Sequence, residues 1–534
     1  MENFPILSLL IFLPIIGMVL ILALPKDKDK TIKWLTLVIT GIQVILAVII
    51  LFFFNFSLGG INDPSSFQFV EKLRWIEISG LAWVGKIKID YFLGIDGISV
   101  VLILLTTIVT FIATLASWNI SKSLKGYFAL FLLLDTAMLG VFVSLDFFLF
   151  YVFWELMLLP MYFLIGVWGG PRREYAAIKF FLYTLLGSIF ILLVMIGLYF
   201  SATETLVDGS KVFTFNLLAL MDPANYNVTG ILSPLNPNNL RFIAYIALFI
   251  GFAIKIPMFP FHTWLPDAHV EAPTAISVIL AGILLKMGTY GILRISFPIF
   301  PEITQQLAWY IGLFGLINII YGALAAMAQK DFKRLIAYSS VSHMGYVLLG
   351  MASLSTAGIT GAVLQMFNHG IITAMLFIIV GIIYDRTHTR EINAFGGLAN
   401  QMPVYTGFVM VAFFAAIGLP GLSGFISEVL VFVGAFGNEL IRVLTIIATL
   451  GILLGAGYML WAFQRIYLGT LKDKWKELTD LTFIEYCMLV PLTIIIIVLG
   501  VYPSVILQFM SASVNAIVKF MANANIIHSS ISTF

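Results

Sequence analysis

Four ionisable side chains lie inside apolar stretches of this 534-residue chain. Lys286 lies near the middle of TAISVILAGILLKMGTYGILRIS, and Lys255 lies within GFAIKIPMFPF. A cation at bilayer depth costs from about 2.5 to more than 10 kcal/mol, so such a residue indicates a function. Two acids, Glu155 and Glu428, occupy similarly apolar runs. Four such groups in one chain predict a path for charge, and lysine and carboxylate side chains carry protons.

Two histidines extend this set of candidates. His343 in SSVSHMGY and His369 in QMFNHG fall within predicted membrane helices. A neutral imidazole both gives and takes a proton, so a relay role is one interpretation. Hydrogen-bonded packing of the two rings is the alternative. Asp135 and Lys179 lie in or beside other predicted helices and are weaker candidates.

A metal site is not predicted in FHTWLPDAHVEAP, although this stretch holds four possible ligands. The spacing of these side chains fits none of the usual zinc patterns. The four residues are His262, Asp267, His269 and Glu271.

The composition indicates a protein that crosses a membrane many times. The chain is 61% hydrophobic and 10% charged, whereas a soluble domain carries about 25% charged residues. A net charge of +2 implies no nucleic-acid partner. The single cysteine, Cys487, excludes an iron–sulfur cluster and a disulfide framework in this chain. No glycine fingerprint follows a predicted strand, so no nucleotide site is expected.

A bilayer span needs about 20 apolar residues, and this rule predicts about fourteen helices. They cover residues 4–24, 33–56, 96–118, 127–144, 147–168, 178–200, 241–261, 274–296, 307–328, 335–352, 358–384, 404–431, 443–468 and 484–507. Segments that follow odd-numbered helices hold 18 of the 29 Lys and Arg residues. The positive-inside rule then predicts both termini on the outer face.

Two short sequences recur in the same order along the chain. GILLKMGTY at 282–290 resembles GILLGAGY at 451–458, and AIKIP at 253–257 resembles AIGLP at 416–420. These matches pair helix seven with helix twelve and helix eight with helix thirteen. The pairs lie an odd number of helices apart, so the two copies would be inverted in the membrane. Inverted repeats with Gly- or Pro-broken helices at the midplane are typical of transporters.

Longer motifs resemble a known family. FPFHTWLPDAHVEAPTAISVILAGILLKMGTYGILR, KRLIAYSSVSHMGY, NHGIITAMLF and GIDGIS are similar to sequences of the antiporter-like subunits of respiratory complex I, the proton-pumping NADH:quinone oxidoreductase. The resemblance implies an all-α membrane fold with inverted five-helix repeats at helices four to eight and nine to thirteen, and with helices seven and twelve broken. The corresponding divisions are 1–126, 127–300, 301–470 and 471–534, the last holding helix fourteen and a C-terminal tail.

The resemblance also implies roles for the buried charges. Glu155 would be the acid of helix five, Lys255 the lysine of broken helix seven, Lys286 the central lysine, and Glu428 the terminal group. In L-type and N-type sister subunits this terminal group resembles a lysine, so glutamate at 428 separates the chain from them. An ion pair between Glu155 and Lys255 is expected, because an unpaired charge at this depth is costly.

The predicted function is therefore that of a proton-translocating membrane-arm subunit of NADH:quinone oxidoreductase. The resemblance places FMN, iron–sulfur clusters and quinone in partner subunits and no cofactor in this chain. L-type and N-type subunits and the lipid bilayer are the expected partners. The expected location is a bacterial cell membrane, with an organelle membrane as the alternative. A subunit of a multi-subunit cation/proton antiporter, a hydrogenase-linked ion pump and an inert scaffold are the alternative functions.

Overall fold

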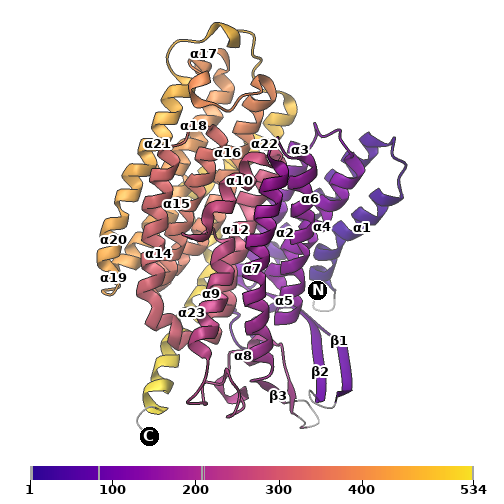
Figure 1. Cartoon of the computed structure of the whole chain (residues 1–534), viewed down its shortest axis with the longest axis vertical. Coiled ribbons are helices and arrows are strands. Elements are labelled where there is room, and N and C mark those ends of the chain that lie inside the picture. Colours follow the sequence, from indigo (N-terminus) through magenta and orange to yellow (C-terminus); the bar gives the residue numbers. More distant parts are fainter. Residues whose placement is uncertain (1–3, 82–84, 206–208, 210, 532–534) are drawn as a thin grey trace.

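A computed structural model of the chain describes residues 4–81, 85–205, 209 and 211–531. Long helices run side by side through most of the molecule, and a β-hairpin projects from one end of the bundle (Figure 1). We call this the hairpin end; the opposite end carries the short helix α17 (Leu398–Gln401) (Figure 1). Both chain termini lie towards the hairpin end (Figure 1).

The first half of the chain supplies twelve of the helices and the small sheets. The helices are α1 (Ile6–Ala23), α2 (Asp29–Phe52), α3 (Gly97–Ala116), α4 (Leu124–Val143), α5 (Phe147–Leu156), α6 (Leu158–Trp168), α7 (Arg173–Tyr199), α8 (Leu217–Leu220), α9 (Arg241–Lys255), α10 (Trp264–Glu271), α11 (Thr274–Ile279) and α12 (Leu285–Gly291). The strands are β1 (Gln68–Leu81), β2 (Gly85–Ile95), β3 (Thr203–Thr205) and β4 (Lys211–Phe213). β1 pairs with β2 and β3 with β4, both antiparallel.

The second half consists of helices and the loops that join them, with no named strand among its described residues. Its helices, besides α17, are α13 (Phe297–Ile299), α14 (Pro301–Met327), α15 (Phe332–Ala352), α16 (Thr356–Thr387), α18 (Pro403–Ile417), α19 (Ser423–Gly437), α20 (Arg442–Ala448), α21 (Leu450–Tyr467), α22 (Phe483–Val501) and α23 (Ser504–Ile531).

The predicted all-α membrane fold is confirmed. Thirteen helical segments within the described residues are long and apolar enough to cross a membrane. Twelve of them correspond to predicted helices, and the thirteenth lies in α23. Predicted helices seven and twelve are absent from these thirteen. Helix seven ends early, at Lys255 in α9, and the short helix α10 begins beyond its predicted end. Helix twelve is divided into the short helices α18 and α19.

The C-terminal segment differs from the prediction of a tail. Helix α22 ends at Val501, because Pro503 cannot continue the backbone ladder, and the 28-residue helix α23 follows. The Ser513 hydroxyl accepts a hydrogen bond from Gly97 N at the start of α3, and Asn515 bonds Thr356 at the start of α16. Helix α23 therefore packs across helix ends from both halves of the chain.

Two helical segments form the centre of the bundle. The segment 274–299 and helix α16 are buried over their entire apolar windows, whereas fewer than half of the residues are buried in the windows of α7 and of α20 with α21. Segment 274–299 is irregular, with π-helical turns at Leu280–Leu284 and Ile292–Ser296. These two segments carry Lys286 and His369, so the fold places the predicted charges where lipid cannot reach them.

Candidate proton pathway

Lys286 follows a π-helical turn in the centre of the bundle. Its side chain is 0% exposed, and its amine donates a hydrogen bond to the carbonyl of Ala281, five residues earlier. A π turn interrupts the regular ladder of backbone hydrogen bonds and is frequent at functional sites. The irregular turn thus supplies an acceptor for a buried amine that has no access to solvent.

His369 on α16 is the second partner of Lys286. The Lys286 Nζ lies 2.7 Å from the His369 Nδ1. A charged lysine has only donors, so Nδ1 is the acceptor and the neutral ring carries its proton on Nε2. That Nε2 has no hydrogen-bond partner among the described residues. His369 is therefore able to accept a proton on one side of its ring and to release one on the other.

His343 on α15 lies beside His369, with ring centroids 5.6 Å apart. Its Nδ1 is 2.8 Å from the Ser339 carbonyl oxygen, and its Nε2 is 3.0 Å from the Ala416 carbonyl oxygen. A neutral imidazole has one N–H and satisfies only one of these acceptors, whereas the protonated ring satisfies both. The Ser339 hydroxyl, 3.3 Å from Nδ1, is a donor for the neutral ring. His343 thus has hydrogen-bond partners in both protonation states.

Glu428, on α19, lies next to His343. Its Oε1 is 3.8 Å from the His343 Nε2, and the carboxyl group is almost fully buried. Helix twelve is interrupted between Ile417 and Ser423, as Pro420 and its neighbouring glycines predicted. Gly418 has φ +82°, and a Cβ at this position would lie 2.8 Å from the Glu428 Oε2. The break therefore makes room for the carboxylate.

We call Lys286, His369, His343 and Glu428 the central row. The structure brings these four predicted residues together, from helices α12, α16, α15 and α19. Lys255 lies on α9, which packs closely on α12: a Cβ at Gly288 would lie 2.7 Å from the Phe252 carbonyl oxygen. The two lysines are thus on neighbouring helices.

The predicted ion pair between Lys255 and Glu155 is wrong for this conformation. The Lys255 amine instead donates to the Met157 sulfur at 3.1 Å and lies 4.8 Å from the centroid of the Trp154 ring. Among the described residues, no carboxylate oxygen lies within 4.0 Å of this amine. Glu155 is nevertheless close enough to act on it electrostatically. The amine has an aromatic ring and a thioether as alternatives to the acid.

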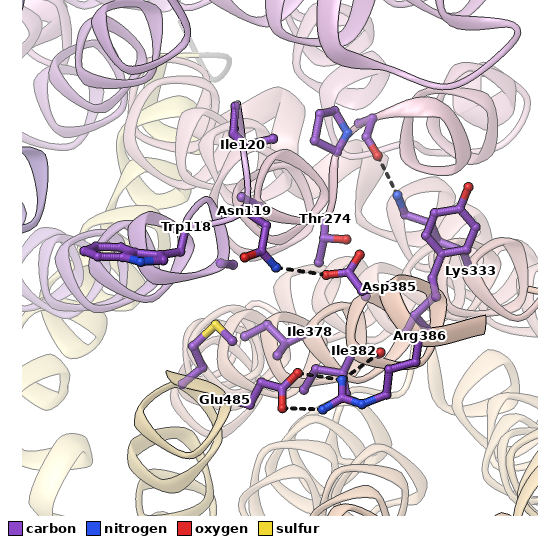
Figure 2. Close-up of a pocket in the computed structure, with 18 of the residues that line it drawn as sticks. Trp118, Asn119, Ile120, Thr274, Lys333, Ile378, Ile382, Asp385, Arg386 and Glu485 are labelled. Atoms are coloured by element: carbon purple, nitrogen blue, oxygen red, sulfur yellow. Dashed lines mark hydrogen bonds and ion pairs between the residues drawn. The ribbon is translucent and has the colours of Figure 1, made fainter. Parts of the chain in front are cut away.

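A cavity of about 760 Å³ opens at the end of the bundle opposite the hairpin. Figure 2 shows Lys333, Asp385, Arg386 and Glu485 among its lining side chains. Arg386 forms a two-pronged ion pair with Glu485, at 2.6 and 2.7 Å, and Asn119 donates to Asp385 at 3.5 Å (Figure 2). The Lys333 amine donates to the Ala272 carbonyl oxygen at 2.6 Å. The polar lining suits water and ions.

His269 is a buried histidine that the sequence indicated only as a possible metal ligand. It lies on α10, whose last turn lines the cavity, and its ring stacks on Phe377 at 4.5 Å. Both ring nitrogens are buried and lack a hydrogen-bond partner within the described part of the chain. Lys333, Lys286 and His369 all lie within electrostatic reach of this ring. No spacing in the sequence distinguishes His269 from its neighbours.

Comparison with known proteins places this arrangement in a family. The family model described as NADH:quinone oxidoreductase/Mrp antiporter, transmembrane, matches residues 144–455. The chain belongs to this family. It is 42% identical to NADH-quinone oxidoreductase subunit M of Rickettsia conorii, over 97% of this chain and 100% of the relative.

Two solved structures share the fold of this chain. A chain of respiratory complex I from Thermus thermophilus with bound NADH is 28% identical, with a TM-score of 0.80 over 96% of this chain and 99% of that chain. A chain of the Mrp complex from Dietzia has a TM-score of 0.77 over 97% of this chain and 100% of that chain, but is 19% identical and shows the fold alone.

These findings confirm the prediction that the chain is a proton-translocating membrane subunit of NADH:quinone oxidoreductase. They favour this function over the alternative of a cation/proton antiporter subunit. The chain is a subunit of an oxidoreductase and a multi-pass membrane protein.

The remaining candidates of this family member have local partners. His262 lies 3.2 Å from the Tyr321 hydroxyl, and Asp267 forms an ion pair with Lys179 at 2.7 Å. Glu271 accepts a hydrogen bond from a backbone N–H, and Asp135 accepts one from the Thr110 hydroxyl. Within the described residues, no three His, Cys, Asp or Glu side chains gather as metal ligands would.

Proposed function

We propose that protons cross this subunit along the central row, from Lys286 through His369 and His343 to Glu428. The observation that supports this most directly is the 2.7 Å contact between the Lys286 Nζ and the His369 Nδ1. An amine and a neutral imidazole at this distance share a hydrogen bond along which a proton can move. The electrons of the reaction travel in partner subunits.

Each step uses a different property of the row. His369 takes a proton from Lys286 on Nδ1 and releases the other proton from Nε2. The 5.6 Å between the two ring centroids is crossed through a water molecule or a rotation of the His369 ring. His343 holds the proton between two carbonyl oxygens until Glu428, 3.8 Å away, accepts it.

Entry of protons takes place through the cavity opposite the hairpin. Its lining combines apolar residues with charged side chains that attract water, and Lys333 lies where the cavity approaches α10. His269, buried on the helix whose last turn lines this cavity, passes protons from the cavity towards Lys286. Its two unpartnered nitrogens within the described structure are suited to this step, because a relay must exchange partners.

Coupling to quinone reduction acts through Glu155 and Lys255. A carboxylate next to a lysine stabilises the charged amine, and its withdrawal removes that stabilisation. Lys255 lies on α9, whose backbone packs directly against α12, so a change in its pairing reaches Lys286 through the contact between these two helices. One charge crossing 100 mV requires about 2.3 kcal/mol, so a modest change in pairing is sufficient.

The orientation and partners follow from the same proposal. The hairpin end is the outer face of a bacterial cell membrane. This orientation follows from the positive-inside rule, because 18 of the 29 Lys and Arg belong to the segments that follow odd-numbered predicted helices, at the opposite end of the bundle. The chain is an M-type subunit that assembles with L-type and N-type subunits. Residues 127–300 and 301–470 are its two inverted repeats, flanked by 1–126 and 471–534.

The test is Lys286→Met in the assembled complex, because methionine keeps the length of the side chain and removes the amine. In reconstituted vesicles we expect proton pumping, followed with a pH-sensitive dye, to fall by a factor of about 10². Lys30→Met, at the exposed start of α2, is the control. Assembly is checked on a native gel. Wild-type pumping by assembled Lys286→Met would exclude the central row. Transport that requires sodium would favour the antiporter alternative.

A further inference from the structure

The Lys255 amine occupies a site formed by Trp154 and Met157, which we call the thioether seat. The sulfur of Met157 accepts from the amine at 3.1 Å, and the Trp154 ring centroid lies 4.8 Å away. A thioether is a weak acceptor, and the face of an indole attracts a cation through its quadrupole. Neither group takes up a proton at ordinary pH. The seat therefore holds the amine without giving its proton a destination.

The seat is held rigidly by its surroundings. The Trp154 indole N–H donates to the Ser188 hydroxyl at 3.1 Å, and its ring stacks on Phe150 and meets the edge of Phe252. Met157 is 1% exposed and is the single residue between two helices, since α5 ends at Leu156 and α6 begins at Leu158. This interruption sets the direction of the Met157 side chain, which contacts the amine rather than lipid.

Glu155 lies on the same turn as the seat. Its Oε1 is buried and has no hydrogen-bond partner among the residues described, while its charge acts on Lys255. Lys255 is the last residue of α9, and the chain beyond it is irregular until α10 begins at Trp264. A four-carbon side chain at a helix end reaches either group by rotation of its own bonds.

We propose that the Lys255 amine alternates between Glu155 and the thioether seat, and that Met157 is a positioning residue for proton translocation. The proposal rests on the function proposed above for Lys255 and names what holds the amine when it leaves the acid. Beside Glu155 the amine is paired with a carboxylate. In the seat it is withdrawn from that carboxylate, while the Trp154 face still stabilises a cation. The seat therefore gives the amine a second position and lowers the fraction of time that it spends beside Glu155.

The first test is Met157→Leu, which keeps an apolar side chain of similar volume and removes the acceptor. In the assembled complex we expect coupled NADH oxidation to fall by about tenfold, with the KM for quinone unchanged. Trp154→Phe is the second variant: it keeps an aromatic face but weakens its attraction for a cation. Met161→Leu, a buried methionine one helical turn further on, is the matched control.

A structural readout separates positioning from packing. In a cryo-EM map of the Met157→Leu complex, we expect the Lys255 amine at ion-pair distance from the Glu155 carboxylate. A double-mutant cycle with Glu155→Gln should be non-additive, because the two sites compete for one amine. Additive effects, or an amine that stays beside Trp154, would overturn the proposal.

Lys255→Met distinguishes this proposal from the one on which it rests. Loss of pumping in Lys255→Met together with wild-type behaviour of Met157→Leu would reject the seat alone. Wild-type pumping by assembled Lys255→Met would reject the role of Lys255 itself, and the seat with it.

Discussion

Lys286 and His369 share a hydrogen bond of 2.7 Å between the two most buried segments of the bundle, although they are 83 positions apart in the chain. The amine also donates to Ala281 within a π-helical turn, so two acceptors orient it. Burying a lysine in this way is costly without compensation. The protein accepts that cost in the central row, where four buried titratable side chains follow one another.

Replacing His369 tests the first step of the row. His369→Phe keeps a planar ring and removes both nitrogens, so Lys286 loses its route to His343. We expect proton pumping in vesicles to fall by a factor of about 10², with the complex still assembled. His388→Asn is the control, because His388 is exposed and its φ of +51° suits asparagine. Unchanged pumping would show that His369 only packs against Lys286.

Glu428→Gln tests the last step. Glutamine keeps the size and hydrogen bonding of the side chain but cannot ionise, so His343 has no acceptor for its proton. We expect impaired pumping and, through coupling, slower NADH oxidation by the intact complex, both measured in reconstituted vesicles. Glu439→Gln, on a side chain that is 88% exposed, should behave as wild type. A wild-type pumping stoichiometry in Glu428→Gln would remove this residue from the pathway.

Hydrophobicity and helix-breaking residues were sufficient to predict most of the fold. Twelve spans and the breaks near Pro257 and Pro420 follow from local sequence, because the bilayer fixes the length of a helix and proline removes a backbone donor. Glu428 was identified by the cost of its burial. Side-chain partners were less predictable. Lys255 was expected to contact Glu155, but its amine has three neighbours on one helical turn, and packing selects among them.

The backbone beside Glu428 gives a matched pair of glycine variants. Gly418 and Gly421 both have positive φ, +82° and +91°, so alanine strains each by about 1–2 kcal/mol. A Cβ at Gly418 also meets the Glu428 Oε2 at 2.8 Å, whereas a Cβ at Gly421 meets no described atom within 4 Å. We expect both variants to lower thermal stability similarly and only Gly418→Ala to reduce pumping. Equal pumping in the two would show that the carboxylate position is unimportant.

A buried ion pair at the hairpin end concerns stability. Asp96 caps α3 by accepting from the backbone N–H groups of Ile98 and Ser99, and it pairs with Arg294. Both side chains are at most 1% exposed. Asp96→Asn leaves a buried guanidinium without its counter-charge, which costs about 3–5 kcal/mol.

The measurement for Asp96→Asn is the midpoint of thermal inactivation of the purified complex, which should drop clearly. Asp63→Asn, an exposed cap in the preceding loop, is the control. The exposed Asp63 carboxylate accepts hydrogen bonds from the Ser65 side chain and backbone, and these hold its pKa below the usual value. An unchanged midpoint for Asp96→Asn would mean that Arg294 finds another acceptor.

His269 tests the proposed entry of protons. His269→Phe keeps the stacking on Phe377 and removes both nitrogens, so protons from the cavity no longer have a relay to Lys286. We expect slower pumping and a larger solvent deuterium isotope effect on NADH oxidation, because proton entry becomes rate-limiting. Phe377→Leu removes the stacking but keeps the imidazole, and should lower stability while preserving the isotope effect. If both variants lower stability equally and neither changes the isotope effect, His269 is a packing residue, and protons reach Lys286 by another route.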